Sequence, residues 1–233
     1  IHAQKPRPNC GREYSGVFNV MLNFPTMLAR YKIPFISLAL LALAIGLVYL
    51  LETREPAPLE FDNSTGVSVI SPPVPLASVT LQDQNGDAFR TSDLEGQWTL
   101  MFFGFTNCPD VCPTTLRTLK QAEERLPQAI NYVFTTLDPR RDTPEKVKEY
   151  LAFFNPDFIG LSGTKDEIDR LSETLGVIYD YEGDVESGDY LVNHYAAILV
   201  IDPKARLRAH ILPPHPVDKV VDATTRLIDY YGH

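Results

Sequence analysis

Two cysteines, Cys108 and Cys112, stand four positions apart, and two thiols at this spacing are able to form a disulfide or to share a metal ion. The strand-like run 98–105 precedes them, and Pro113, which suits the first position of a helix, follows them. Because a proline restricts the residue before it to extended backbone, Pro109 and Pro113 should hold both sulfurs just outside the helix N-terminus. The positive end of the helix favours the thiolate, which attacks disulfides and binds soft metals.

The alternative is that both cysteines are small buried hydrophobic side chains. The chain has only three cysteines, and two of them occupy one short loop flanked by prolines, which favours a reactive site. The third, Cys10, falls in the N-terminal segment and is expected to take no part.

The segment 33–51 contains nineteen residues and no charged side chain. As a helix it would be about 28 Å long, close to the roughly 30 Å of a bilayer core. The first 51 residues carry five basic side chains and one acidic one, so the part after the segment should be exported. A cleaved signal peptide would have a shorter apolar core followed by small residues, whereas Glu52-Thr-Arg-Glu55 follows here, which favours an uncleaved anchor.

The sequence therefore predicts a cytoplasmic basic lead (1–32), a single-pass transmembrane anchor (33–51), a Pro-rich tether (52–75) and one domain (76–233). Residues 52–233 carry a formal charge of −13, which argues against binding to nucleic acid. The exported domain should face a bacterial periplasm from the inner membrane, or else the mitochondrial intermembrane space. The lead has no obvious Arg/Ser-rich transit peptide, which favours bacteria.

The apolar spacing within the domain predicts an α/β fold. The expected order is a β-hairpin around Asn85-Gly86, a β-α-β unit with the thiols at its first turn, two helices, a second hairpin and a final helix. This order is typical of a thioredoxin-like mixed sheet flanked by helices. The expected elements are strands 79–82 and 88–91, strand 98–105, helix 113–126, strand 131–137, helices 144–154 and 166–175, strands 196–201 and 206–212, and helix 217–231.

Three histidines of the domain are candidates for a further functional group. His194 should lie in a loop before strand 196–201, near the sheet end from which the cysteine loop emerges. His210 falls on the second strand of the late hairpin, and His215 stands between two prolines. Since a lone histidine is more often a packed side chain than a ligand, position alone does not choose among them.

Three motifs resemble those of the Sco/SenC family, and the resemblance covers essentially residues 75–233. They are Phe103-Gly-Phe-Thr-Asn-Cys-Pro-Asp-Val-Cys-Pro113, Leu137-Asp-Pro-Arg-Arg-Asp-Thr-Pro-Glu145 and Tyr190-Leu-Val-Asn-His194, with Ile201-Asp-Pro203 after the last. The resemblance implies a membrane-anchored copper protein of thioredoxin fold that acts in cytochrome c oxidase assembly.

By that resemblance the copper ligands are Cys108, Cys112 and His194, and Asp138 has a structural role or supports the ligands. His215 inherits no role. Two thiolates and one imidazole suit Cu(I) and also accept Cu(II), whereas zinc would require a fourth ligand from water or a carboxylate. The implied partner is the copper-accepting subunit of cytochrome c oxidase, which receives copper for its dinuclear centre, alongside other copper chaperones or thiol oxidoreductases.

The main alternative to a copper chaperone is a thiol-disulfide reductase that keeps acceptor cysteines reduced. In that case Cys108 would attack and Cys112 would resolve the mixed disulfide. The spacer between them is one residue longer than in the redox C-x-x-C motif, and disulfide exchange leaves His194 without a task. A copper or redox sensor would use the same three ligands, and nothing in the sequence argues for a peroxidase. A conventional enzyme is therefore not expected.

Overall fold

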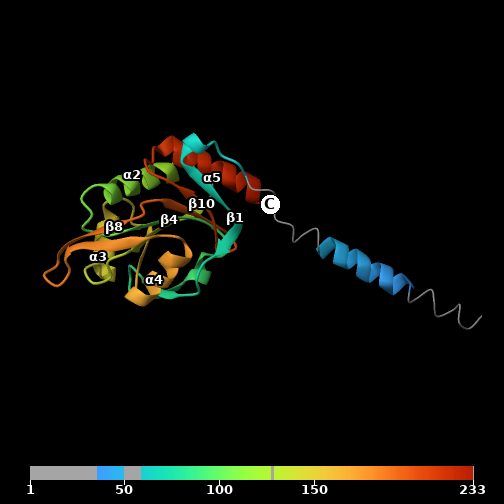
Figure 1. The fold of residues 1–233 in the computed structure, drawn as a ribbon, viewed down its shortest axis with the longest axis horizontal. Helices are drawn as coiled ribbons and strands as arrows, with labels where there is room; N and C mark the ends of the chain where they lie inside the picture. Colours follow the sequence, from blue (N-terminus) through green and yellow to red (C-terminus); the bar gives the residue numbers. More distant parts are fainter. Residues whose placement is uncertain (1–35, 50–58, 127–128, 233) are drawn as a thin grey trace, which may run out of the picture. The chain divides into compact units, whose positions relative to one another are not determined.

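The computed structural model describes residues 36–49, 59–126 and 129–232 (Figure 1). The chain divides into two compact units, Ile1–Glu55 and Pro56–His233. In the first unit, residues 36–49 form an α-helix whose side chains are exposed along its whole length. Among the described residues, no helix has the length and hydropathy needed to cross a membrane. The predicted lead 1–32, both ends of the predicted anchor and Cys10 lie outside the described residues.

A mixed sheet of eight strands forms the centre of the second unit, in the order β1-β10-β9-β4-β5-β6-β2-β3 (Figure 1). Strand β4 runs parallel to β5 on one side and antiparallel to β9 on the other. Every residue of β4 and β9 is buried, as expected for strands covered on both faces. The strands are β1 (Val67–Pro75), β2 (Thr80–Asp83), β3 (Ala88–Arg90), β4 (Trp98–Gly104), β5 (Ile130–Thr136), β6 (Ile159–Ser162), β9 (Ile198–Asp202) and β10 (Arg206–Ile211).

Helices cover both faces of this sheet. On one face α2 (Val111–Glu123) packs against α5 (Val217–Tyr231), and on the other α3 (Pro144–Ala152) lies on β6 and α4 (Lys165–Thr174) lies on β2 (Figure 1). The Thr143 side chain accepts a hydrogen bond from the Lys146 amide and so caps the start of α3, which begins at the predicted residue, Pro144. The predicted order of hairpin, β-α-β unit, two helices, hairpin and helix is confirmed.

A separate two-stranded sheet, β7 (Tyr179–Asp184) with β8 (Asp189–His194), was not predicted, and neither was β6. Burial alternates along β8: Tyr190 and Val192 are buried, while Leu191 and Asn193 are exposed. Strand β7 alternates in the same way at its start, where Tyr179 and Tyr181 are half-buried and Asp180 and Glu182 are exposed, but its acidic residues make this pattern hard to recognise in the sequence. The expectation that His194 lies in a loop is wrong, because it is the last residue of β8.

The prediction that residues 52–75 form a tether is wrong for residues 67–75, which form edge strand β1 and pair antiparallel with β10. The register shifts between Val69 and Val74, and Pro72 and Pro73 fall inside this shift. Prolines are tolerated there because an irregular edge strand does not need every amide for its ladder. The side chains of Val69 and Val74 pack against the core. Residues 52–58 lie outside the described part of the chain.

Candidate metal centre

Cys108 and Cys112 lie where β4 leads into α2, as the sequence predicts, and both are free thiols. Cys108 is half-buried in the loop, and its amide donates to the Phe105 carbonyl at 3.2 Å. Cys112 is fully buried against the core. The two positions therefore differ sharply in their access to solvent.

Helix α2 begins at Val111, two residues before the predicted start, so Cys112 belongs to its first turn. The prediction that both sulfurs lie outside the helix is therefore wrong for Cys112. Pro113 does not delay the helix, because amides of the first turn have no helical acceptor and a missing N–H costs nothing there. The Cys112 amide instead donates to Cys108 Sγ at 3.4 Å.

The two thiols have opposite acidities. The hydrogen bond from the Cys112 thiol, with further ones from His194 and from backbone amides, outweighs burial and lowers the pKa of Cys108 to about 4. That same hydrogen bond, together with burial, raises the pKa of Cys112 far above its usual value. At neutral pH the pair is one thiolate and one thiol, so an ion that takes both sulfurs must displace the Cys112 proton.

His194 approaches the cysteines from β8, and its Nε2 lies 3.8 Å from Cys112 Sγ. The imidazole makes edge contacts with Phe102 and Phe105, with ring centroids 5.9 and 6.3 Å away. Its Nδ1 is buried and has no hydrogen-bond partner among the described residues. Packing therefore orients the ring, and Nε2 is the nitrogen directed at the sulfur.

The spacing of Cys112 and His194 suits a shared ion. A sulfur about 2.3 Å and a nitrogen about 2.0 Å from one metal lie about 3.5 to 3.7 Å apart at tetrahedral to trigonal angles. The observed 3.8 Å is close to that separation. Within the described ranges, however, no cluster of three or more His, Cys, Asp or Glu side chains is arranged to hold an ion. A third ligand therefore requires a rearrangement, and Cys108 is the nearest soft donor.

Asp142 fixes the backbone just before Cys108. Its carboxylate accepts hydrogen bonds from the Thr106 amide at 2.9 Å, from the Thr106 hydroxyl at 2.5 Å and from the Thr136 hydroxyl at 2.6 Å. Asp142 is fully buried, so these donors replace water around its charge. Asp142 falls within one of the three family motifs, but no sequence pattern pairs it with Thr106, which is 36 positions away.

Asp138 is also fully buried, and it does not contact the thiols directly. Its carboxylate accepts from Arg141 Nε at 2.5 Å and from the Tyr190 hydroxyl at 2.7 Å. Tyr190 belongs to β8, the strand that carries His194. These contacts agree with the structural or supporting role expected for Asp138.

The other described histidines lie outside this cluster. In His215, Nδ1 contacts the Thr115 hydroxyl at 3.2 Å and Nε2 contacts the Ile211 carbonyl at 3.0 Å, and burial lowers its pKa to about 4. It therefore joins α2 to the C-terminal segment as a neutral ring. His210 Nδ1 lies 3.4 Å from the Tyr195 hydroxyl. His2 and His233 fall outside the described residues.

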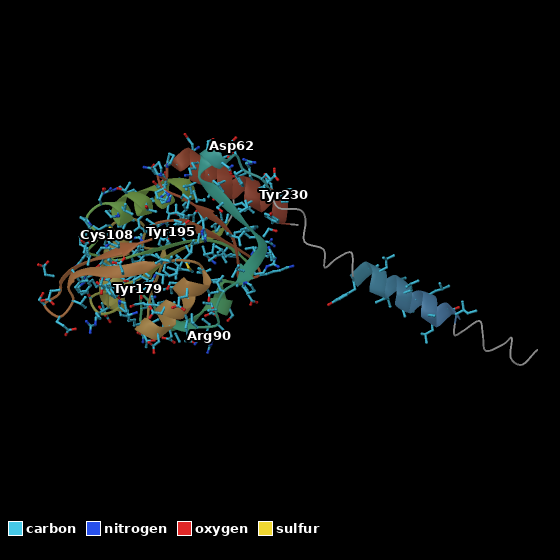
Figure 2. The ribbon with its side chains drawn as sticks, in the orientation of Figure 1. Asp62, Arg90, Cys108, Tyr179, Tyr195 and Tyr230 are labelled. Atoms are coloured by element: carbon cyan, nitrogen blue, oxygen red, sulfur yellow. The ribbon has the colours of Figure 1, made fainter. Side chains whose placement is uncertain are left out.

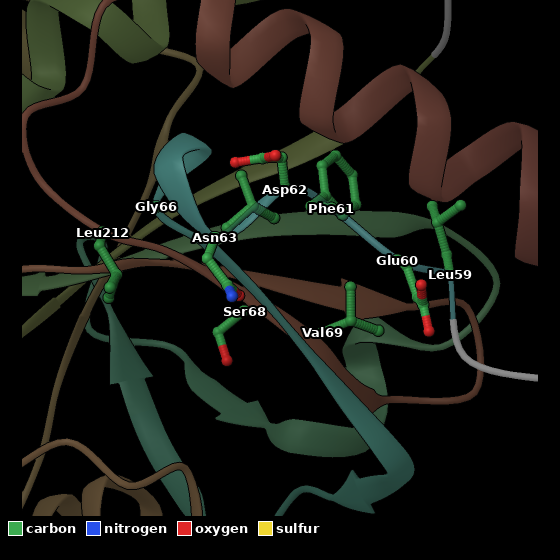
Figure 3. A pocket seen from close by; sticks show the side chains of 10 residues that line it. Leu59, Glu60, Phe61, Asp62, Asn63, Gly66, Ser68, Val69 and Leu212 are labelled. Atoms are coloured by element: carbon green, nitrogen blue, oxygen red, sulfur yellow. The ribbon is translucent and has the colours of Figure 1, made fainter.

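The domain also has an open groove of about 700 Å³ beside β1, bordered by Leu59, Asp62, Val69 and Leu212 (Figure 3). None of the residues that line it is a cysteine or a histidine. Figure 2 labels Asp62 at the top of the domain and Cys108 at its left side. The groove is therefore separate from the cysteine site.

A helix-flanked mixed sheet with two cysteines after its central strand and a histidine facing them defines a thioredoxin-like domain equipped for metal or thiol chemistry. The chain belongs to the SCO1/SenC family, whose family model matches residues 76–229. This match confirms the resemblance read from the three sequence motifs.

Two curated relatives illustrate the similarity. An SCO2-like protein of Rickettsia felis is 40% identical over 134 residues, which are 56% of this chain and 65% of the relative. The mitochondrial SCO1 homolog 1 of Arabidopsis thaliana is 31% identical over 201 residues, which are 82% of this chain and 60% of that protein. The chain thus spans less than two thirds of the length of these two relatives.

Solved structures confirm the fold. Arabidopsis thaliana ScoI with copper bound superposes with a TM-score of 0.63 at 32% identity, covering 67% of this chain and 99% of that one. Yeast Sco1 with copper bound gives a TM-score of 0.64 at 31% identity, covering 68% and 91%. The thioredoxin-like Sco fold of the second unit is therefore established.

Proposed function

We propose that this protein binds one copper ion through Cys108, Cys112 and His194 and passes it to another protein. The observation that carries the proposal is the 3.8 Å separation of Cys112 Sγ and His194 Nε2, with the Cys108 sulfur next to the same helix turn. Two sulfurs and one imidazole form a soft donor set that suits Cu(I) and accepts Cu(II). The copper-bound structures of similar proteins support the choice of metal.

The unequal burial of the ligands suits transfer rather than storage. Cys112 is buried and His194 is held between aromatic rings, whereas Cys108 is half-buried in a loop. An acceptor thiol or imidazole is able to approach from the Cys108 side and to bind the ion before the donor ligands leave. Because only three protein side chains bind the ion, one coordination position stays open for a ligand from the acceptor.

The acceptor that we propose is the copper-binding subunit of cytochrome c oxidase, as membership of the family suggests. We further propose that residues 33–51 anchor the protein in the inner membrane and that the domain faces the periplasm. The uncharged composition of this segment and the five basic side chains among the first 51 residues support this placement. Anchoring would keep the copper site close to a membrane-bound acceptor.

A transfer assay tests the function. The full chain, loaded with one equivalent of Cu(I), is mixed without oxygen with the soluble domain of the oxidase subunit, and copper on each protein is measured after separation. We expect copper to move to the acceptor from the wild type, and His194→Ala to hold too little copper to donate. Retention of copper on the wild-type chain in the presence of excess acceptor would contradict the proposal.

A thiol reductase is the second candidate, and the low pKa of Cys108 favours it because an exposed thiolate attacks disulfides. The same assay separates the two functions when an acceptor with an oxidised cysteine pair is used. A reductase reduces the pair without copper, while Cys108 and Cys112 are oxidised to a disulfide, and it keeps this activity in His194→Ala. A chaperone delivers copper only to the reduced acceptor and depends on His194.

A further inference from the structure

The loop 138–142, between β5 and α3, contacts both halves of the copper site. We name it the bracket loop. Its last residue, Asp142, holds Thr106 through the backbone amide and the hydroxyl, two residues before Cys108. The bracket loop therefore fixes the chain that leads into the cysteine loop.

Arg141, the residue before Asp142 in the bracket loop, holds the β7–β8 hairpin. The Arg141 guanidinium lies 3.5 Å from the centre of the Tyr190 ring and donates to the carbonyls of Tyr190 and Gly188 at 3.0 and 3.1 Å. Its Nε donates to Asp138, which also accepts from the Tyr190 hydroxyl. Arg141 thus donates to the backbone of the hairpin, stacks on the Tyr190 ring and pairs with the Asp138 carboxylate.

These side-chain contacts matter because, in the described part of the chain, no backbone ladder joins the hairpin to the eight-stranded sheet, and side chains alone hold it. Tyr181 donates to the Leu137 carbonyl at 2.9 Å, and Tyr190 and Val192 are buried in the core. Residues two apart on a strand point to the same face, so Tyr190, Val192 and His194 all face the domain. A contact that holds Tyr190 in place therefore also helps to hold the His194 side chain near Cys112.

We propose that Arg141 is a positioning residue that holds the histidine-bearing hairpin against the cysteine loop and thereby sets how fast copper is released. This inference rests on the proposed function, in which His194 is a ligand. Through Asp142, the bracket loop holds Thr106, which belongs to the cysteine half of the site. Through Arg141, it holds Tyr190, which belongs to the histidine half. Loosening Arg141 frees one half of the site while the other stays fixed.

The neighbouring arginine provides a matched control. Arg140 also reaches the hairpin, where it pairs with Glu186 at 3.4 Å, but the side chains are 59% and 87% exposed. The Arg141 and Asp138 side chains are only 18% and 0% exposed. Exposed ion pairs contribute little, whereas breaking a buried, hydrogen-bonded pair is costly. Only the Arg141 contact is therefore expected to hold the hairpin.

The first test uses the metal-free full chain in detergent and measures amide hydrogen exchange in β8. We expect exchange to be about tenfold faster in Arg141→Ala and unchanged in Arg140→Ala, with the amides of β4 and β5 protected as in the wild type. Tyr190→Phe removes only the hydroxyl contact with Asp138, so a smaller increase is expected, and it serves if Arg141→Ala does not fold. Wild-type exchange of β8 in both Arg141→Ala and Tyr190→Phe would overturn the proposal.

The second test measures Cu(I) release to a strong chelator in a double-mutant cycle. We expect Arg141→Ala to speed release about tenfold when His194 is present and to add nothing in a His194→Ala background. Equal acceleration in both backgrounds would mean general damage and would overturn the positioning role. If His194→Ala alone leaves copper binding unchanged, the proposed ligand set fails, and the exchange test on the metal-free protein still decides the role of Arg141.

Discussion

Cys108 and Cys112 form one motif, yet their surroundings give them different chemical tasks. Cys108 is half-buried, and hydrogen bonds led by the one from the Cys112 thiol lower its pKa to about 4. Cys112 is buried and keeps its proton. We therefore regard Cys108 as the sulfur that meets an incoming ion or acceptor first, and Cys112 as the sulfur that closes the site.

This asymmetry predicts an unusual pH dependence of alkylation. Between about pH 6 and pH 8, the rate at which iodoacetamide modifies Cys108 in the metal-free chain should change less than about twofold, because the thiol is already ionised above its folded pKa. An ordinary thiol gains about tenfold per pH unit over this range. Timed peptide mass spectrometry measures each site, with free cysteine as control. A tenfold rise per unit at Cys108 would contradict the assignment.

Gly104 makes room for the Cys112 sulfur. A Cβ atom at position 104 would lie 2.8 Å from Cys112 Sγ and 3.0 Å from the Phe134 ring. We expect Gly104→Ala to lower the free energy of unfolding by about 1–3 kcal/mol and to weaken copper binding, since the sulfur must move. Chemical denaturation and a chelator competition measure the two effects.

Gly160→Ala is the matched control for Gly104→Ala. Its Cβ atom would lie 2.4 Å from Val147 and 2.7 Å from Leu151, in a buried position where neither cysteine is among its nearest neighbours. This variant should lose comparable stability and keep its copper affinity. If both variants bind copper as the wild type does, the close fit between Gly104 and Cys112 has no role in the site.

At the scale of elements, edge strand β1 should contribute measurably to stability. It pairs with β10 and packs partly buried valines and an isoleucine on the core, so a chain that starts at residue 76 loses both. We expect a loss of at least about 2 kcal/mol, or a Tm about 5 °C lower. A chain that starts at residue 59 keeps β1 and is the control. Thermal unfolding with the same Tm for both chains would contradict this role.

The local sequence predicts the elements whose signals are local. The buried strand before Cys108, the Asn85-Gly86 hairpin and α5 were predicted because apolar spacing and turn residues mark them. Strand β1 was missed because its prolines resemble those of a linker, and β7 because its acidic side chains hide the alternation. Asp142 and Arg141 could not be predicted as supports of the site, since their partners Thr106 and Tyr190 are 36 and 49 positions away.

At the scale of the whole molecule, the first described residues of the second unit lie far from the cysteine loop. Leu59 donates its amide to the Tyr231 hydroxyl at 2.9 Å, and Arg226 stacks on Phe61 at 4.0 Å. Tyr230, next to that contact, and Cys108 lie at opposite ends of the domain (Figure 2). The first described residues of the second unit therefore pack at the end of the domain that lies away from the cysteine loop.

Copper should stabilise the whole domain, because the three proposed ligands come together only in the folded state. At a free copper concentration one hundred times the Kd, the stabilisation is about 2.7 kcal/mol. For a chain of this size we expect the Tm to rise by about 5–10 °C. Differential scanning calorimetry of the full chain measures this, and Cys108→Ser with Cys112→Ser is the control. An unchanged Tm at saturating copper would contradict binding to the folded domain.

The most direct test of the central claim is an anaerobic titration of the reduced full chain with Cu(I), under competition from a strong chelator, beside His194→Ala and His215→Ala. His215 is the matched control because its ring nitrogens contact Thr115 and the Ile211 carbonyl rather than either cysteine. The three-ligand site predicts one copper per chain, tight binding in His215→Ala and a loss of at least about tenfold in affinity in His194→Ala. Equal affinity of the wild type and His194→Ala would contradict it.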